Sequence, residues 1–332
     1  MESAYQAARQ RAAFIDRSAR GRLVVSGRDR ASYLQGLLTN DIPAIKAGEG
    51  CYAAYLTPQG RMISDLWVYE LGDVMLLNLA GEVAAGVLAK LDQFIFSEDV
   101  QLGDVSATFA QVAVVGPEAA RIVTALLDGP PVVPDVSLGA LPEHGNLRGH
   151  VDGSPAIVTR VTDTGEPGFD VYVERERTGW LKQRLVSSGA QEADEETAEV
   201  LRVEAGVPAF HRDMNEETIP LEAGIESRAI SMTKGCYVGQ EVIIRVLHRG
   251  HGRVARKLVG LVLEHAWAPA RGAIVKSGER DAGKITSAVH SPALGRPIAL
   301  AYVQRDFMAP GTALSVEGAL ATVTALPFVS RR

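Results

Sequence analysis

Hydrophobic and polar positions in the first hundred residues form short runs of two kinds. Residues 23–26 are an apolar run typical of a short strand, and residues 33–38 carry apolar side chains at helical spacing behind Asp29, a suitable helix N-cap. Three further strand patterns fall within residues 51–81, before a helical pattern over residues 82–96. This order of three strands and then a helix predicts an α+β fold.

The pattern changes character at Lys257. Before it, residues 109–206 alternate between strand and helix patterns, which continues the α+β order. After it, short β-rich runs such as "GKITSAVHS" and "IALAYVQ" are separated by turn residues. The C-terminal part is therefore predicted to form a small all-β barrel or sandwich.

The composition is that of a folded globular protein. Of 332 residues, 46% are hydrophobic and 22% are charged, which excludes collagen-like, disordered and disulfide-rich classes. The sequence lacks an apolar run of the roughly 20 residues that a membrane span needs, and its N-terminus lacks a secretory apolar core. We therefore expect a cytoplasmic protein without membrane association. The formal net charge of −6 argues against nucleic acid as a partner.

The two cysteines, Cys51 and Cys236, are expected to be reduced thiols, because neither lies in a CxxC or zinc pattern. Cys236 stands in "KGCYVGQE" beside Gly235, where the backbone can turn tightly. A helix opening near Glu241, with Lys234 close by, would favour a thiolate at this cysteine. The alternative is a small buried apolar side chain, the usual state of a free cysteine.

A basic run follows this motif. Residues 245–257 carry five bases and no acid, with Arg245 and Arg249 four residues apart. Such a run is either a solvated face or a site for a carboxylate tail or phosphate, which Arg binds bidentately. His248 and His251 belong to no complete set of metal ligands, so no metal site is predicted.

Glu204 is a single acid among apolar residues in "LRVEAG". One reading is an exposed residue at the end of a helix, since acids seldom enter a core. The other is an acceptor for a ligand with paired N–H donors, such as a pterin ring.

Several segments together resemble the folate-binding family that includes the T-protein (aminomethyltransferase) of the glycine cleavage system and the YgfZ-type iron–sulfur assembly proteins. The resemblance rests on "YLQGLLTNDI", "YLTPQGRMISDLWVY", "LRVEAGVPAFHRDMNEETIPLEAG", "ITSAVHSPALGRPIALAYV" and the terminal "LPF". The most specific segment is "KGCYVGQE", which is similar to the YgfZ signature K-G-C-Y-x-G-Q-E.

The resemblance implies a ring of two α+β domains and a C-terminal β-barrel around a central folate site. The expected domains are residues 1–45 with 155–245 for folate binding, residues 46–154, and residues 255–332 for the barrel. It also implies tetrahydrofolate as the cofactor. The residues that match the family's motifs are Cys236 and Lys234 in the functional thiol motif, and Glu204, Arg245, Arg249, Tyr237 and Gln240 near the folate.

One catalytic position departs from the T-protein pattern. Asn78 aligns with an asparagine that precedes the T-protein's catalytic aspartate, and the same count places Ala85 where that aspartate stands. A methyl group cannot take or orient a proton. This departure argues against aminomethyl transfer.

Three functional hypotheses follow. The first is a tetrahydrofolate-binding protein that assists iron–sulfur cluster assembly or repair through Cys236, with iron–sulfur client or assembly proteins as partners. The alternative is a folate-dependent aminomethyltransferase or demethylase, whose carboxylate would have to come from Asp41 or Asp65. The third is a folate-binding scaffold with a structural cysteine.

Overall fold

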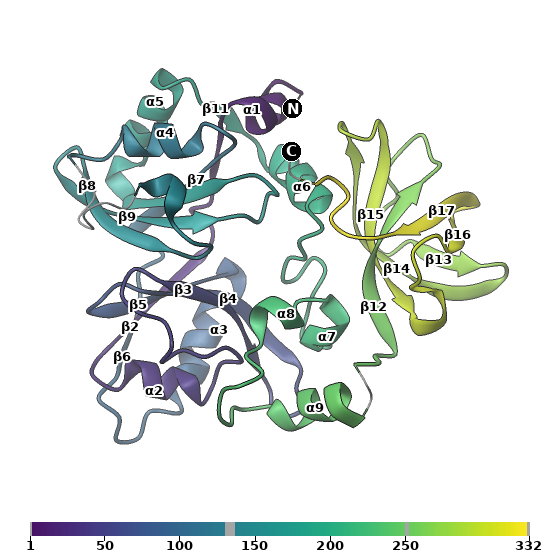
Figure 1. Cartoon of the computed structure of the whole chain (residues 1–332), viewed down its shortest axis with the longest axis horizontal. Coiled ribbons are helices and arrows are strands. Elements are labelled where there is room, and N and C mark those ends of the chain that lie inside the picture. Colours follow the sequence, from purple (N-terminus) through teal and green to yellow (C-terminus); the bar gives the residue numbers. More distant parts are fainter. Residues whose placement is uncertain (1, 130–136, 250–251, 331–332) are drawn as a thin grey trace.

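The protein consists of three lobes, and the chain passes repeatedly between the first two (Figure 1). The computed structural model describes residues 2–129, 137–249 and 252–330, without the side chains of residues 2, 248 and 249. Two lobes combine a sheet with helices, and the third is a closed six-stranded barrel, which confirms the predicted fold class. Among the helices in the described ranges, none is long and apolar enough to cross a membrane.

The first lobe is built on a six-stranded sheet with the order β11-β1-β7-β10-β9-β8, in which only β1 and β11 pair in parallel. Its strands are β1 (Ala13–Asp16), β7 (Phe109–Val115), β8 (Asn146–Val151), β9 (Ser154–Val161), β10 (Gly168–Glu174) and β11 (Gln191–Ala193). Alternate residues of β1 and β7 enter different cores, because successive strand side chains point to opposite faces. One face packs on α4 (Ala119–Thr124) and α5 (Thr178–Ser187), the other on α1 (Glu2–Gln10), α6 (Glu195–Glu204) and the barrel.

The second lobe is an antiparallel five-stranded sheet with the order β3-β4-β5-β2-β6. Its strands are β2 (Gly21–Ser26), β3 (Gly50–Leu56), β4 (Met62–Glu70), β5 (Val74–Leu79) and β6 (Gln101–Asp104). One face is covered by α2 (Arg30–Gln35) and α3 (Gly81–Asp92). The other receives α7 (Pro220–Ala223), α8 (Glu226–Ala229) and α9 (Gln240–Ile244), and α9 continues into a π-helical turn, Arg245–Arg249.

The third lobe is the barrel, closed in the order β12-β15-β14-β13-β16-β17 by pairing of β17 with β12. Its strands are β12 (Arg256–Leu263), β13 (Ile274–Ser277), β14 (Arg280–Ser291), β15 (Arg296–Gln304), β16 (Ala313–Val316) and β17 (Ala319–Thr324). Short 3-10 helices at Leu138–Ala140, Arg175–Arg177 and Arg305–Phe307 complete the described elements. Leu258 of β12 and Leu300 of β15 pack on α6, so the barrel shares a core with the first lobe.

The sheets divide the chain differently from the expected boundaries at residues 45 and 154. β2 pairs with β5 and β6 in the second lobe, whereas the expected boundary keeps residues 1–45 in the first. β7 and β8 belong to the first sheet, whereas the expected boundary keeps residues 46–154 in the second. The physical reason is that strands far apart in the sequence can pair, and the hydrophobic pattern of one strand does not determine its partner.

Candidate functional site

A cavity of about 360 Å³ lies where the first two lobes meet. Its walls come from the β1–β2 connection, from β4, from the turn after β9, from α6 and from the segment that follows α6. The polar and aromatic lining includes Arg17, Arg20, Asp65, Trp67, Glu82, Asp163, Thr164, Glu199, Arg202, Phe210 and Arg212. Its volume falls within the range of small-molecule sites, roughly 300–1,000 Å³.

Strand β4 places Asp65 and Trp67 in this cavity because they lie two residues apart and share one face of the sheet. The intervening Leu66 points into the core under α2 and α3. Asp65 is 6% exposed and accepts a hydrogen bond of 2.7 Å from the Tyr52 hydroxyl. Burial raises the pKa of Asp65, outweighing that hydrogen bond and the charge of Arg20. This carboxyl group is therefore easier to protonate than an ordinary aspartate.

Trp67 and Arg20 line the cavity together with Asp65, and the Arg20 guanidinium lies over the indole ring. The Arg20 guanidinium carbon lies 4.7 Å from the Trp67 ring centroid, and the Tyr52 ring centroid is 5.3 Å from it. Arg20 also donates to the Asn78 side chain, which in turn donates to Tyr172 across the lobe boundary. An indole and a held guanidinium offer a surface on which a planar ring can stack.

The turn after β9 contributes one charged and one unpaired polar group. Burial opposes ionisation of Asp163, but Arg17 at 2.8 Å prevails and lowers the pKa of the carboxyl group. The Thr164 hydroxyl is buried and has no hydrogen-bond partner among the described residues. An unmet buried polar group costs about 1–3 kcal/mol.

Two family models match this chain. The GCVT N-terminal domain matches residues 1–234, and the glycine cleavage T-protein C-terminal barrel domain matches residues 256–330. The chain belongs to the glycine cleavage T-protein family.

Relatives with the name "Aminomethyltransferase" match over almost the whole chain. The protein from Rubrobacter xylanophilus is 34% identical over 100% of this chain and 87% of its own length. That from Streptomyces coelicolor is 33% identical over 98% and 88%. The crystal structure of glycine cleavage system aminomethyltransferase T from Bartonella henselae superimposes with a TM-score of 0.89 at 23% identity, over 99% of this chain and 90% of that one. That structure supports the shared fold.

Glu204, which the family resemblance places against the folate, has other partners in this structure. It is fully buried at the end of α6, and the Tyr5 hydroxyl donates to it at 2.7 Å. Arg9 forms an ion pair with it, and the Ser291 hydroxyl donates to its other oxygen. Both carboxylate oxygens are thus occupied, and Glu204 is not one of the residues that line the cavity within the described chain. These contacts make Glu204 a junction between α1, α6 and β14, and its expected place against the folate stays a prediction.

Lys234 is also occupied by internal contacts. Its ammonium donates to the backbone oxygens of Gln35, Leu38 and Asn40 at 2.7, 2.6 and 2.9 Å. All three ammonium hydrogens are used to hold the chain that leaves α2. Burial lowers the pKa of Lys234 to about 8. Lys234 therefore holds the chain after α2, and its expected part in the thiol motif stays a prediction.

Cys236 is exposed in the loop before α9, whereas Cys51 is buried in the core under α2 and α3, and both described thiols are free. Burial raises the pKa of Cys51 to about 12. The exposure of Cys236 contradicts the reading of this cysteine as a buried apolar side chain. The expected helix after the motif is present as α9, with Gly239 at its N-cap in a left-handed conformation, φ 85°.

The remaining motif residues lie apart from the cavity. Tyr237 is buried against the α7–α9 side of the second sheet, and burial raises its pKa to about 12. Gln240 accepts from the Tyr237 backbone N–H, and Arg245 pairs with Glu241 at 2.6 Å on the surface. The side chain of Arg249 lies outside the described residues. Within the described chain, the cavity lining thus includes none of Tyr237, Gln240 and Arg245.

Of the positions considered for the T-protein's catalytic aspartate, Asp65 lines the cavity within the described chain, and Ala85 and Asp41 do not. Ala85 stands on the exposed side of α3, outside the cavity. Asp41 lies in the loop after α2 and accepts from the Gln35 amide. The period-two pattern of "ISDLW" could have indicated that Asp65 and Trp67 share a face. The sequence carries no comparable signal for Asp163 and Thr164, which lie in a turn.

Proposed function

We propose that this protein binds tetrahydrofolate in the central cavity and transfers a one-carbon unit there, as a folate-dependent aminomethyltransferase or demethylase. Family membership and the name shared by its relatives support this class, which is the alternative hypothesis drawn from the sequence. The observation that carries the proposal is Asp65, a buried carboxyl group with a raised pKa on the cavity wall.

The reaction moves a proton from N5 of tetrahydrofolate to the departing amine. N5 forms a bond to the transferred carbon and loses a proton, while the bond from that carbon to the donor nitrogen breaks and the amine gains a proton. With an aminomethyl donor, N10 then forms a bond to the same carbon and loses a proton, while the bond from that carbon to the rest of the donor breaks and the departing carrier gains a proton, which gives 5,10-methylenetetrahydrofolate. A carboxyl group beside N5 and the donor nitrogen can accept the proton from N5 and supply it to the amine. Because burial raises its pKa, Asp65 is suited to hold a proton between these steps.

The other residues that line the cavity suit tetrahydrofolate as the ligand. The pterin ring stacks on Trp67 and Arg20, and the ionised Asp163 accepts from its paired N–H donors. In this proposal Asp163, rather than Glu204, is the acid that faces the pterin.

Calorimetric titration with tetrahydrofolate tests the site. The sharpest variant is Asp163→Asn, which keeps the shape of the side chain and removes the charge that this proposal sets against the paired N–H donors of the pterin. We expect it to weaken binding about tenfold, the effect of one charge-assisted ligand hydrogen bond. Separate titrations of Ser287→Ala and Glu204→Gln show how the residues around the cavity affect tetrahydrofolate binding. Absence of binding by the wild-type protein would contradict the proposal.

The exposed thiol supports a second candidate function. Cys236 is accessible in a loop that resembles the YgfZ signature, which suits iron–sulfur cluster assembly or repair on a client protein. In cells that lack the native copy, Cys236→Ser should then abolish restoration of iron–sulfur enzyme activity, whereas Cys51→Ser should retain it. Equal restoration by Cys236→Ser and the wild type would remove this candidate.

A further inference from the structure

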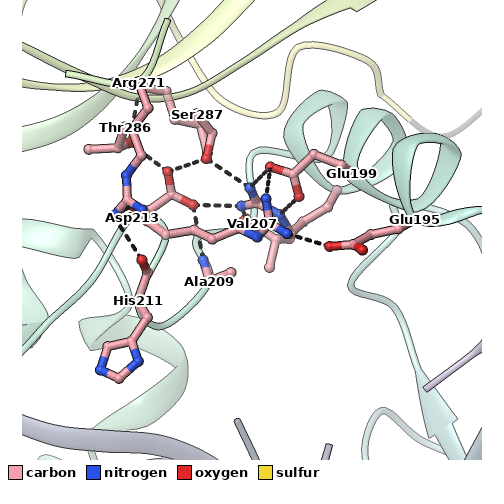
Figure 2. A network of polar contacts seen from close by, with 12 residues as sticks. Glu195, Glu199, Val207, Ala209, His211, Asp213, Arg271, Thr286 and Ser287 are labelled. Atoms are coloured by element: carbon pink, nitrogen blue, oxygen red, sulfur yellow. Dashed lines mark hydrogen bonds and ion pairs between the residues drawn. The ribbon is translucent and has the colours of Figure 1, made fainter. Parts of the chain in front are cut away.

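The segment 207–213, between α6 and α7, connects the cavity to the barrel. Val207, Phe210 and Arg212 of this segment line the cavity. Its last residue, Asp213, has a side chain with no exposed surface and lies against β14 of the barrel (Figure 2). Asp213 therefore links the segment that lines the cavity to the barrel.

The Asp213 carboxylate accepts four hydrogen bonds. One oxygen accepts from the Thr286 and Ser287 hydroxyls at 2.5 and 2.8 Å. The other accepts from Arg202 at 2.7 Å and from the Ala209 backbone N–H at 3.1 Å. Since an ionised carboxylate offers about four acceptor positions, Asp213 is fully used in holding its neighbours.

The barrel presents the two hydroxyls through a bulge. In β14 the register shifts between Ile285 and Ser287, so Thr286 is the extra residue of the strand. Successive side chains of a regular strand point to opposite faces, and a bulge is what lets two consecutive hydroxyls reach one oxygen atom. Arg271 of the barrel also holds the segment, because it donates hydrogen bonds to the backbone oxygens of His211 and Arg212.

Arg202 links Asp213 to α6 through its hydrogen bonds. Its five N–H donors are all engaged: two with Glu199, two shared between Asp213 and the Val207 oxygen, and one with Ser287. Arg202 therefore has no donor left for a ligand. It fixes the Glu199 carboxylate and the start of the segment at the edge of the cavity.

The backbone of the segment is also held in an unfavourable conformation. His211 has φ 62°, in the left-handed region that non-glycine residues seldom adopt. Such a conformation persists only where surrounding contacts determine it. The backbone of His211 is held by the Met214 backbone oxygen, which accepts from the His211 N–H at 2.6 Å, and by Arg271 of the barrel, which donates to the His211 oxygen.

We propose that Asp213 is a positioning residue for the central cavity: the bulge of β14 holds it, and it fixes the wall formed by Arg202 and residues 207–212. The barrel thereby sets the affinity of the cavity for its ligand. This inference rests on the proposed folate site for its binding consequence, but its structural part stands independently.

The Glu204 cluster provides a matched control. Glu204 and Asp213 are both buried acids that pair with an arginine and with a serine of β14, Ser291 and Ser287 respectively. Within the described chain, Asp213 bonds to Arg202 and Ala209, which line the cavity, whereas the side-chain partners of Glu204 are not lining residues. Asp213→Asn is therefore compared with Glu204→Gln, and the milder Ser287→Ala with Ser291→Ala in case the first pair folds poorly.

Two measurements decide the proposal, each at a temperature well below unfolding. Hydrogen–deuterium exchange of amides 207–214 should accelerate in Asp213→Asn and Ser287→Ala and stay at the wild-type rate in the Glu204→Gln and Ser291→Ala controls. Calorimetry should show tetrahydrofolate binding weakened about tenfold in Asp213→Asn and less than about twofold in the controls. The proposal is overturned if exchange is unchanged in Asp213→Asn, or if both serine variants lose affinity equally. If the wild type binds no tetrahydrofolate, the folate proposal fails, and exchange alone decides the positioning role.

Discussion

The central cavity and the loop at residues 234–241 present their chemistry in opposite ways. The cavity buries Asp65 between two lobes, beside Trp67 and Arg20. The loop exposes Cys236 and turns its other chemically suggestive residue, Lys234, inward to three backbone oxygens. The residues of a specific sequence motif can therefore be engaged mostly in internal contacts, with one accessible thiol, while residues outside any motif line the cavity.

The largest effect expected is loss of transfer in Asp65→Asn. Without a carboxyl group to move protons, formation of 5,10-methylenetetrahydrofolate from an aminomethyl donor should slow at least about a hundredfold. Asp41→Asn is the matched control, because Asp41 lies outside the cavity and contacts Gln35. A normal rate in Asp65→Asn, or an equal loss in Asp41→Asn, would place the reacting carboxylate elsewhere.

Within the loop, Lys234 and Cys236 should differ in their effect on stability. Lys234→Met leaves three backbone oxygens without their donor and should lower the free energy of unfolding by about 3 kcal/mol in urea titrations. Cys236→Ser changes an exposed side chain and should stay within about 0.5 kcal/mol. Comparable destabilisation by the two changes would show that the loop folds around its thiol.

The sequence predicted the fold better than it predicted the site, for a physical reason. Apolar periodicity reports which face of an element is buried, so the barrel, the strands and α9 could be anticipated. It does not report which buried acid meets which arginine. Glu204 and Asp213 are both buried acids of one sequence segment, yet one joins α1 to β14 and the other shapes the cavity edge. Only the packing of the barrel against α6 separates their roles.

The buried Asp65 of the cavity should also make the stability of the protein depend on pH. Burial raises the pKa of Asp65, so the folded state holds this proton more tightly than the unfolded state does. Stability from this group is therefore greatest at low pH and falls as pH rises from the unfolded pKa, about 4, through the folded pKa. The melting temperature of Asp65→Asn should rise relative to that of the wild type between pH 4 and 7. A difference that does not vary with pH would show that Asp65 is not desolvated.

The smallest effect expected is that of a ligand in the cavity on the rate at which Cys236 in the loop reacts. In the native protein, a thiol reagent such as 5,5′-dithiobis(2-nitrobenzoate) should modify Cys236 rapidly and Cys51 only after unfolding, since Cys236 is exposed and Cys51 is buried with a raised pKa. Saturating tetrahydrofolate should leave the rate at Cys236 unchanged, because the lining of the cavity within the described residues does not include this thiol. The Cys51→Ser variant isolates the fast reaction for this comparison. Protection of Cys236 by the ligand would mean that folate binding reaches the loop, and would join the cavity and the thiol in one function.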